Sequence, residues 1–218
     1  MHCAIIVKPK QKKNTSGGFM VSFFTEILVK YFFLTTPFFA LSMFLAMTPD
    51  LTAVERGRLA NRVAFAAWII TAVLFVFGQV IFRVFGISVD AFRIGAGALL
   101  FLSAVSLMNP KVKPAEREEG DDIAVVPLAM PVVIGPATCG PLLVLSADIG
   151  DWMSRGVAAL ALSAALVALW GILRIGAWIE QRLGKKGIAI LMRMTGLVLS
   201  ALSAQMIMTG VVAFLKSK

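Results

Sequence analysis

Residues 93–104 read RIGAGALLFLSA, and residues 193–204 read RMTGLVLSALSA. Both stretches begin with an arginine, continue as an apolar run and carry Leu-Ser-Ala at the same distance from that arginine. Each follows a short linker that contains glycine, residues 85–90 in the first case and 184–187 in the second. The pattern indicates one unit present twice. If each copy contains three membrane spans, the odd number forces the two copies into opposite orientations, which makes an inverted repeat.

Composition indicates that lipid is the main solvent of this chain. Hydrophobic residues make up 59% of its 218 residues, charged residues make up only 15%, and the mean hydropathy is +0.87. A soluble domain carries about 25% charged residues. A membrane span needs roughly 20 mainly apolar residues, and it must be helical because hydrocarbon cannot satisfy peptide groups. Six windows qualify: residues 23–47, 63–82, 91–108, 123–147, 156–178 and 188–214.

These observations predict an all-α integral membrane protein whose six transmembrane helices form two inverted three-helix repeats. The first repeat covers residues 20–108, and the second covers residues 123–214. A linker of mixed charge, residues 109–122, joins them. Residues 1–19 are polar, and a first helix can follow Met20 directly, so we expect these residues to be an extension upstream of the natural start.

The net charge of +9 follows a membrane pattern and does not indicate a nucleic-acid partner. Lysine and arginine accumulate on the cytoplasmic side of membrane proteins. Here they gather in the first, third and fifth connections between spans, and the second and fourth connections hold little beyond Arg83 and Arg155. We therefore expect the odd connections in the cytoplasm and both termini outside it. The residues that carry this expectation are Arg56, Arg58, Arg62, Lys111, Lys113, Arg117, Arg182, Lys185 and Lys186.

Two spans contain helix breakers. Residues 125–141 read VVPLAMPVVIGPATCGP, and this density of proline and glycine is incompatible with one regular helix. A broken helix persists in a membrane only where it is buried in protein or lines a cavity. We expect two half-helices that meet around Gly135-Pro136, and a weaker break at Thr35-Thr36-Pro37 in the first span. Prolines that merely kink a helix for packing remain the alternative, most of all for Pro37.

The breaks are the candidate site for a small solute. Half-helix N-termini attract a carboxylate and C-termini attract a cation, so freed backbone groups and nearby hydroxyls can hold the two ends of a zwitterion. The candidate substrate-binding residues are Thr35, Thr36, Pro37, Pro131, Gly135, Pro136 and Thr138.

Three further polar residues lie in the apolar runs. Arg93 and Arg193 either snorkel to the nearest membrane surface or pin and gate the broken helices. Gln205 bonds either a partner helix or the substrate. Small residues such as Gly95, Gly97 and Gly196 indicate faces where helix backbones pack closely.

An enzyme is the weaker interpretation. Hydrolysis inside a membrane needs a nucleophile with a base, or a metal. The only histidine is His2, no carboxylate pair lies inside a span, and the two cysteines, Cys3 and Cys139, have no metal-site spacing. We therefore expect no catalytic residues, no metal and no cofactor.

Three motifs together resemble the MarC family of bacterial inner-membrane proteins. They are residues 126–136 (VPLAMPVVIGP), residues 85–97 (FGISVDAFRIGAG) and residues 187–197 (GIAILMRMTGL). The resemblance covers about residues 22–212 and implies six spans, a bacterial inner-membrane location and kinship with small neutral amino acid transporters. Members usually carry Asn or Asp before the first-span proline, whereas Thr36 stands here, so ion coupling through that position is in doubt.

The sequence therefore predicts a secondary transporter of small solutes such as neutral amino acids. A passive channel, or a packing subunit of another membrane complex, is the alternative. No nucleotide-binding loop is present, so the driving force would be an ion gradient or the gradient of the substrate itself. The coupling ion, the direction of transport and self-association stay open.

Overall fold

The computed structural model describes residues 16–108 and 133–216, and its seven elements in these ranges are α-helices. The elements are α1 (Ser16–Leu34), α2 (Pro37–Met47), α3 (Ala53–Phe85), α4 (Val89–Met108), α5 (Pro136–Asp148), α6 (Trp152–Arg174) and α7 (Gly176–Lys216). This confirms the expectation of an all-α membrane protein. The linker 109–122 and much of the fourth predicted span lie outside the described residues.

Five described stretches are long and apolar enough to cross a bilayer. They are Met20–Met47, Ala53–Phe85, Val89–Met108, Trp152–Arg174 and Lys186–Lys216. Large apolar side chains such as Phe65 and Val76 point out of the bundle and are more than half exposed, as expected where lipid surrounds a protein.

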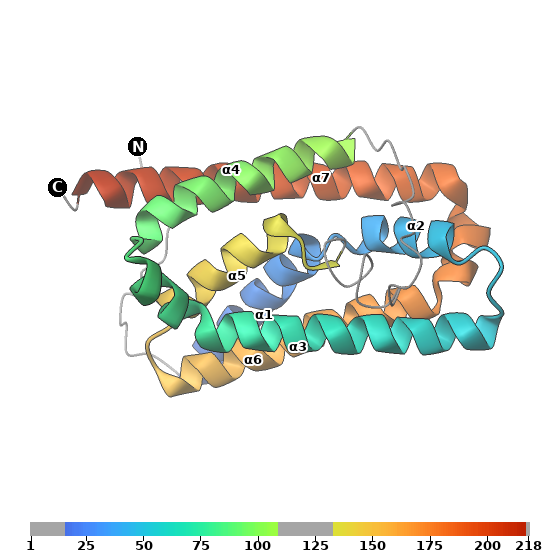
Figure 1. Cartoon of the computed structure of the whole chain (residues 1–218), viewed down its shortest axis with the longest axis horizontal. Coiled ribbons are helices and arrows are strands. Elements are labelled where there is room, and N and C mark those ends of the chain that lie inside the picture. The colour runs from blue at the N-terminus through green and yellow to red at the C-terminus, as the bar shows by residue number, and fades with distance from the viewer. Residues whose placement is uncertain (1–15, 109–132, 217–218) are drawn as a thin grey trace.

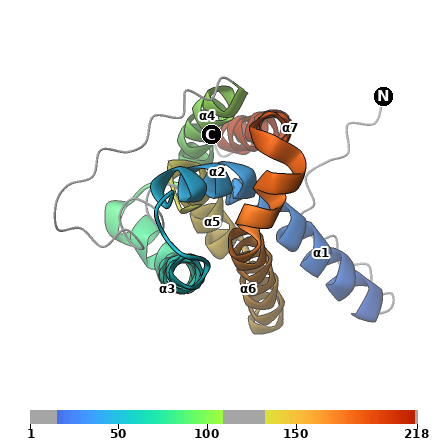
Figure 2. The same ribbon diagram turned by 90° about the vertical axis from the view of Figure 1, so that its right-hand side faces the viewer.

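The helices form layers that run along the long axis of the molecule (Figure 1). The antiparallel helices α4 and α7 pack together on one side, and α3 and α6 pack together on the opposite side. The short helices α2 and α5 lie between these pairs, and α1 runs beside α6 (Figure 2). Because α2 is apolar all round, it is suited to this interior position. Its buried residues are Pro37, Ala40, Leu41, Met43, Phe44 and Met47.

The contact between α4 and α7 depends on small residues. A Cβ atom on Gly97 would lie 2.6 Å from the Ile207 side chain, and one on Gly196 would lie 2.9 Å from the carbonyl oxygen of Ala104. Without a hydrophobic driving force between helices in lipid, such close approach is how membrane helices associate. Gly95 differs from the expectation, because it is exposed and has nothing within 4 Å of its Cβ position.

Helices α3 and α6 both begin with a capping side chain. Thr52 accepts a hydrogen bond from the Glu55 amide (3.3 Å), and Glu55 accepts one from the Thr52 amide (2.8 Å), so the two residues form a capping box. Asp151 caps α6 by accepting from the Ser154 amide (2.8 Å), and this bond holds the pKa of the Asp151 carboxyl below its usual range.

An arginine in the first turn of each of these helices reaches back to the preceding short helix. Arg56 of α3 donates to the carbonyls of Thr48 (3.0 Å) and Pro49 (3.1 Å), which follow the end of α2. Arg155 of α6 donates to the carbonyl of Ile149 (3.2 Å), which follows the end of α5. A cation at a helix C-terminus satisfies orphan carbonyls and favours the helix dipole.

Helix α7 changes direction at Gly184. This residue has φ 65° and ψ 172°, a conformation open essentially to glycine alone. The segment before it, residues 176–183, is helical, whereas the sequence predicted that the fifth span would run to residue 178. The span instead ends at Arg174, because a new helical segment begins at Gly176.

One buried hydrogen bond joins α1 to α3. The hydroxyl groups of Tyr31 and Thr71 lie 2.6 Å apart, and the two residues are only 2% and 3% exposed. A phenol inside an apolar core needs such a partner, because an unmade hydrogen bond there costs about 1–3 kcal/mol.

Candidate functional site

The first span breaks where the sequence places Thr35, Thr36 and Pro37. Helix α1 ends at Leu34, Thr36 adopts the left-handed conformation with φ 45°, and Pro37 is the first residue of α2. A left-handed threonine is uncommon and costs of order 1–3 kcal/mol. The N–H groups of Thr35 and Thr36 still bond back to Tyr31 and Phe33 (both 3.0 Å). The break is therefore sharp and confined to two residues.

The fourth span has a comparable feature. Helix α5 begins at Pro136, and Gly135 is its N-cap in an extended conformation. The carbonyl of Gly135 accepts from the amides of Thr138 and Cys139, both at 2.9 Å. Pro131 and the predicted first half-helix lie outside the described residues.

A threonine hydroxyl connects the two breaks. Thr138, in the first turn of α5, has its Oγ1 2.9 Å from the carbonyl oxygen of Leu34 and 3.2 Å from that of Val133. Both carbonyls precede a break, and the described chain shows no main-chain hydrogen bond to Leu34 from α2. Thr138 is only 1% exposed, so its hydroxyl meets both carbonyls in the interior of the protein. Residues about one hundred positions apart thus meet inside the protein.

The N-termini of α2 and α5 point toward each other at this place, and the two helices run outward in opposite directions (Figure 1). Neither N-cap residue, Thr36 or Gly135, makes a side-chain capping bond. Two positive helix-dipole ends and the buried hydroxyls of Thr35 and Thr138 therefore converge on one region. This arrangement favours an anionic group such as a carboxylate.

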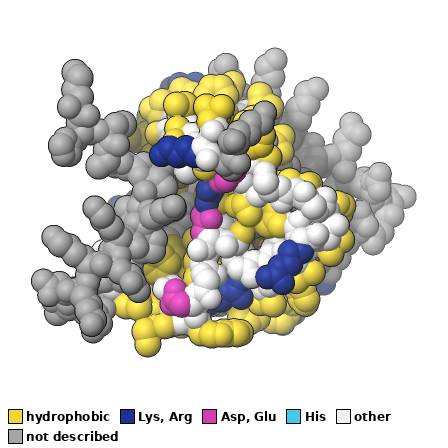
Figure 3. All heavy atoms as spheres, turned by 90° about the vertical axis from the view of Figure 1, so that its left-hand side faces the viewer, with side chains coloured by type: hydrophobic (Ala, Val, Ile, Leu, Met, Phe, Trp, Pro, Cys, Tyr) yellow, Lys and Arg dark blue, Asp and Glu magenta, His cyan; other side chains and the backbone are white. Residues whose placement is uncertain are grey.

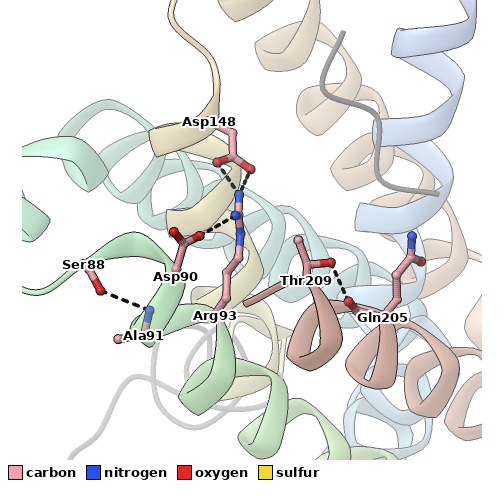
Figure 4. A network of polar contacts seen from close by, with 7 residues as sticks. All are labelled: Ser88, Asp90, Ala91, Arg93, Asp148, Gln205 and Thr209. Carbon is pink, nitrogen blue, oxygen red and sulfur yellow. Dashed lines mark hydrogen bonds and ion pairs between the residues drawn. The ribbon is translucent and has the colours of Figure 1, made fainter. Parts of the chain in front are cut away.

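Arg93 belongs to a separate ion network at the C-terminal end of α5. Its guanidinium donates to Asp90 at 2.9 Å and to both carboxylate oxygens of Asp148, the last residue of α5 (Figure 4). The Arg93 side chain is only 15% exposed. Figure 3 shows acidic and basic side chains meeting near the middle of one end of the molecule, among apolar side chains. Arg93 therefore links α4 to the C-terminal end of the broken span.

Arg193 and Gln205 are not part of this network. Arg193 is exposed on α7 and makes no hydrogen bond or ion pair among the residues that the structure describes. Gln205 lies on α7 beside the network (Figure 4), and its main-chain carbonyl accepts from the Thr209 hydroxyl at 2.7 Å. The structure thus brings together Thr35, Thr36, Pro37, Gly135, Pro136 and Thr138, and leaves these two residues apart.

Two polar residues of α5 were missed by sequence reasoning. Asp148 is the first charged residue after the fourth apolar window, and in the six-span prediction that end of the window lies on the same side of the membrane as Arg93. This shared side could have indicated that the two residues form a pair. Ser146 donates to the carbonyl of Phe75 at 2.6 Å, and the absence of a side chain at Gly78 makes room for it. Nothing in the sequence pattern pairs Ser146 with α3.

In residues 16–108 and 133–216, no three His, Cys, Asp or Glu side chains are grouped so that they could hold a metal ion. Cys139, on α5 close to the break, is a free thiol.

The helices and the converging breaks define the class: a multi-pass, all-α integral membrane protein with an interrupted, buried interior. The chain belongs to the MarC family of integral membrane proteins, because the family's model matches residues 21–215.

Relatives occur in bacteria and archaea. The chain is 32% identical to a UPF0056 membrane protein of Pyrococcus horikoshii over 83% of its own length and 90% of the relative. It is 29% identical to the UPF0056 membrane protein YvbG of Bacillus subtilis over 88% of its own length and 95% of the relative. The UPF0056 membrane protein YhcE of Escherichia coli is also 29% identical, over 85% and 90%. No solved structure matches the chain.

Proposed function

We propose that this protein is a secondary transporter of small solutes such as neutral amino acids, built from two inverted three-helix repeats. The observation that carries the proposal is the meeting of two helix breaks through Thr138 and Leu34. Inverted-repeat transporters bind their substrates where discontinuous helices meet near the middle of the membrane.

Matching positions in the two halves support the repeat. Pro37 and Pro136 each begin a short helix after a break, and Arg56 and Arg155 each bond the carbonyls that follow that helix. The two members of each pair are equally far apart along the chain. A chance resemblance of apolar sequences would not reproduce both a helix start and an arginine contact.

The packing between the halves also fits two-fold symmetry. Helices α4 and α7 are antiparallel, so Gly97 of α4 meets the Ser203–Ile207 part of α7, and Gly196 of α7 meets the Ala104–Leu107 part of α4. Each helix therefore presents an equivalent small-residue face to the other, as expected from two copies in opposite orientations.

The chemistry of the break region favours a zwitterion. The uncapped N-termini of α2 and α5 suit a carboxylate, and the hydroxyl oxygens of Thr35 and Thr36, with the carbonyls of the break, can accept from an ammonium group. No described Asp or Glu is buried there, so this region offers no fixed charge that would discriminate against a neutral amino acid.

Arg93 and Arg193 form the gates in this proposal. Arg93 ties α4 to Asp148 at the end of α5, whereas Arg193 is exposed and without such a partner in the described chain. Asp50, which follows α2 as Asp148 ends α5, is also exposed. During transport, the Arg93–Asp148 contact opens on one side of the membrane as Arg193 and Asp50 approach on the other. This exchange is alternating access in its simplest form.

The loop charges orient the transporter. The basic residues of the first and fifth connections lie at the end of the bundle opposite Asp148, and by the positive-inside rule that end is cytoplasmic. Both termini and the Arg93–Asp148 contact then lie outside the cytoplasm. In a bacterium this corresponds to the periplasmic face of the inner membrane.

Counterflow in proteoliposomes tests the proposal. Vesicles loaded with an unlabelled neutral amino acid should transiently concentrate the labelled form, because a carrier exchanges substrate, whereas a channel only equilibrates it. The variant Gly135→Leu should abolish exchange while still inserting, because the added side chain enters the buried break. Gly156→Leu is the matched control, since Gly156 is exposed and has nothing within 4 Å of its Cβ position. Normal exchange by Gly135→Leu would falsify the site, and equilibration without counterflow would assign the protein to the channel class.

A further inference from the structure

A basic pocket lies between the start of α3 and the end of α6, far from the helix breaks. It has a volume of about 330 Å³ and is lined by Ala53, Val54, Gly57, Arg58, Asn61 and Arg174. None of these residues belongs to the proposed transport site. The pocket is therefore distinct from that site.

The guanidinium of Arg174 is held in place by neutral neighbours. It donates to the Asn61 side chain at 3.1 Å and lies 5.7 Å from the ring centroid of Trp170. The same Asn61 oxygen accepts from the Trp170 indole at 2.8 Å. Gly57 faces the guanidinium, since a Cβ atom there would be in ordinary van der Waals contact with Arg174 Cζ at 3.7 Å. Arg174 is thus oriented before any ligand arrives.

The pocket carries two positive charges, Arg58 and Arg174, and only the first has a described carboxylate nearby, since Glu55 lies close enough to Arg58 to interact with it electrostatically. Among the described residues, no ion pair involves Arg58 or Arg174. The nearest acidic side chain along α3, Glu55, is already occupied by the Thr52 amide (2.8 Å) and hydroxyl (2.7 Å). Arg58 and Arg174 come from neighbouring helices and line the same pocket, and each guanidinium has the planar fork of donors that suits the oxygens of a phosphate.

The position of the pocket indicates which phosphate it takes. Arg58 is near the beginning of α3 and Arg174 is the last residue of α6, so both lie at the level of the lipid headgroups. Trp170, one turn deeper, is a typical residue of the membrane interface. The outward face of α3 below the pocket is apolar, and Phe65 is 65% exposed there. This surface matches a ligand whose phosphate lies in the pocket and whose hydrocarbon chains lie along the apolar face of α3.

We propose that Arg58 and Arg174 bind the phosphate of an anionic phospholipid, with the acyl chains against the exposed face of α3. Basic pockets between transmembrane helices bind such headgroups elsewhere. The site is separate from the substrate path, so the proposal does not depend on transport.

Native mass spectrometry of the purified protein tests the proposal, with phosphatidylglycerol, phosphatidylcholine or inorganic phosphate added in turn. We expect phosphatidylglycerol to be retained in preference to phosphatidylcholine, and inorganic phosphate at equal concentration to displace little of it. The double variant Arg58→Gln, Arg174→Gln should lose this retention by about tenfold or more, as removal of charge-assisted hydrogen bonds implies.

Arg83→Gln, which removes an exposed arginine at the other end of α3, is the matched control and should retain phosphatidylglycerol. If the double variant folds poorly, lipid retention by the single variant Arg58→Gln still tests the proposal, because Arg174 keeps its contacts with Asn61 and Trp170 in that variant. Undiminished retention by Arg58→Gln and the double variant, or equal retention of both lipids, would overturn the proposal. Strong binding of inorganic phosphate without lipid preference would assign the pocket to a soluble anion instead.

Discussion

Replacing Thr138 with valine tests the link between the two helix breaks. Valine has the shape of threonine without the hydroxyl, so the packing changes little. The carbonyl oxygens of Leu34 and Val133, 2.9 and 3.2 Å from the hydroxyl, then lose their shared donor. An unsatisfied buried carbonyl costs about 1–3 kcal/mol in proteins generally, and side-chain hydrogen bonds in membranes average about 0.6 kcal/mol with a maximum near 1.7. We expect Thr138→Val to lower the free energy of unfolding by about 1–2 kcal/mol.

The assay is equilibrium unfolding in mixed micelles, followed by far-ultraviolet circular dichroism. Thr195→Val is the matched control, because Thr195 is also buried but donates to Leu191 of its own helix, a carbonyl that the helical ladder already serves. We expect that control to lose no more than about 0.5 kcal/mol. Thr138→Ser, which keeps the hydroxyl, should lie closer to wild type than Thr138→Val.

Equal losses for Thr138→Val and Thr195→Val would refute the reasoning, since they would mean that the contact with Leu34 adds nothing beyond an ordinary intrahelical bond. A larger loss for Thr138→Ser than for Thr138→Val would also refute it, because packing of the methyl group would then outweigh the hydrogen bond.

Three further outcomes are expected. Gly140→Ala should destabilise the protein by about 1–3 kcal/mol in the same unfolding assay, because its Cβ would lie 2.5 Å from that of Ala96, whereas Gly156→Ala should be neutral or stabilising; equal effects would contradict close packing of α4 on α5. Asp148→Asn should raise the rate at which an impermeant thiol reagent labels Cys139, by about fivefold at most because the ion pair is partly exposed. An unchanged labelling rate would show that the Arg93–Asp148 pair is not a gate. Arg193→Ala should misfold or lose counterflow, and full counterflow activity in this variant would mean that Arg193 only snorkels to the membrane surface.

The starts of α2 and α5 could be predicted from sequence because their cause is local. Proline removes a backbone donor wherever it occurs, so Pro37 and Pro136 marked helix starts without any knowledge of the fold. The end of α6 was harder to predict. Residues 175–178 are apolar, but the chain turns there into another helical segment. Apolar character alone does not show where a helix changes direction.

The partners across the structure could not be predicted in the same way. The acceptor for Thr138 is a main-chain carbonyl, which every residue carries, so no side chain in the sequence identifies Leu34. Arg93 was recognised as unusual, but its partner Asp148 is separated from it by half a repeat. Likewise Gly95 and Gly97 are alike in sequence, yet only Gly97 packs against α7, because helical periodicity turns Gly95 toward an open pocket that Cys139 and Gly140 of α5 also line.

The bond between Tyr31 and Thr71 has a practical consequence. Tyr31 is the only tyrosine in the chain, and its main-chain carbonyl accepts from Thr35 at the edge of the first break. Biosynthetic replacement of tyrosine by fluorotyrosine therefore labels one known core position without altering the sequence. A single fluorine resonance would then follow the interior of the bundle as ligands are titrated.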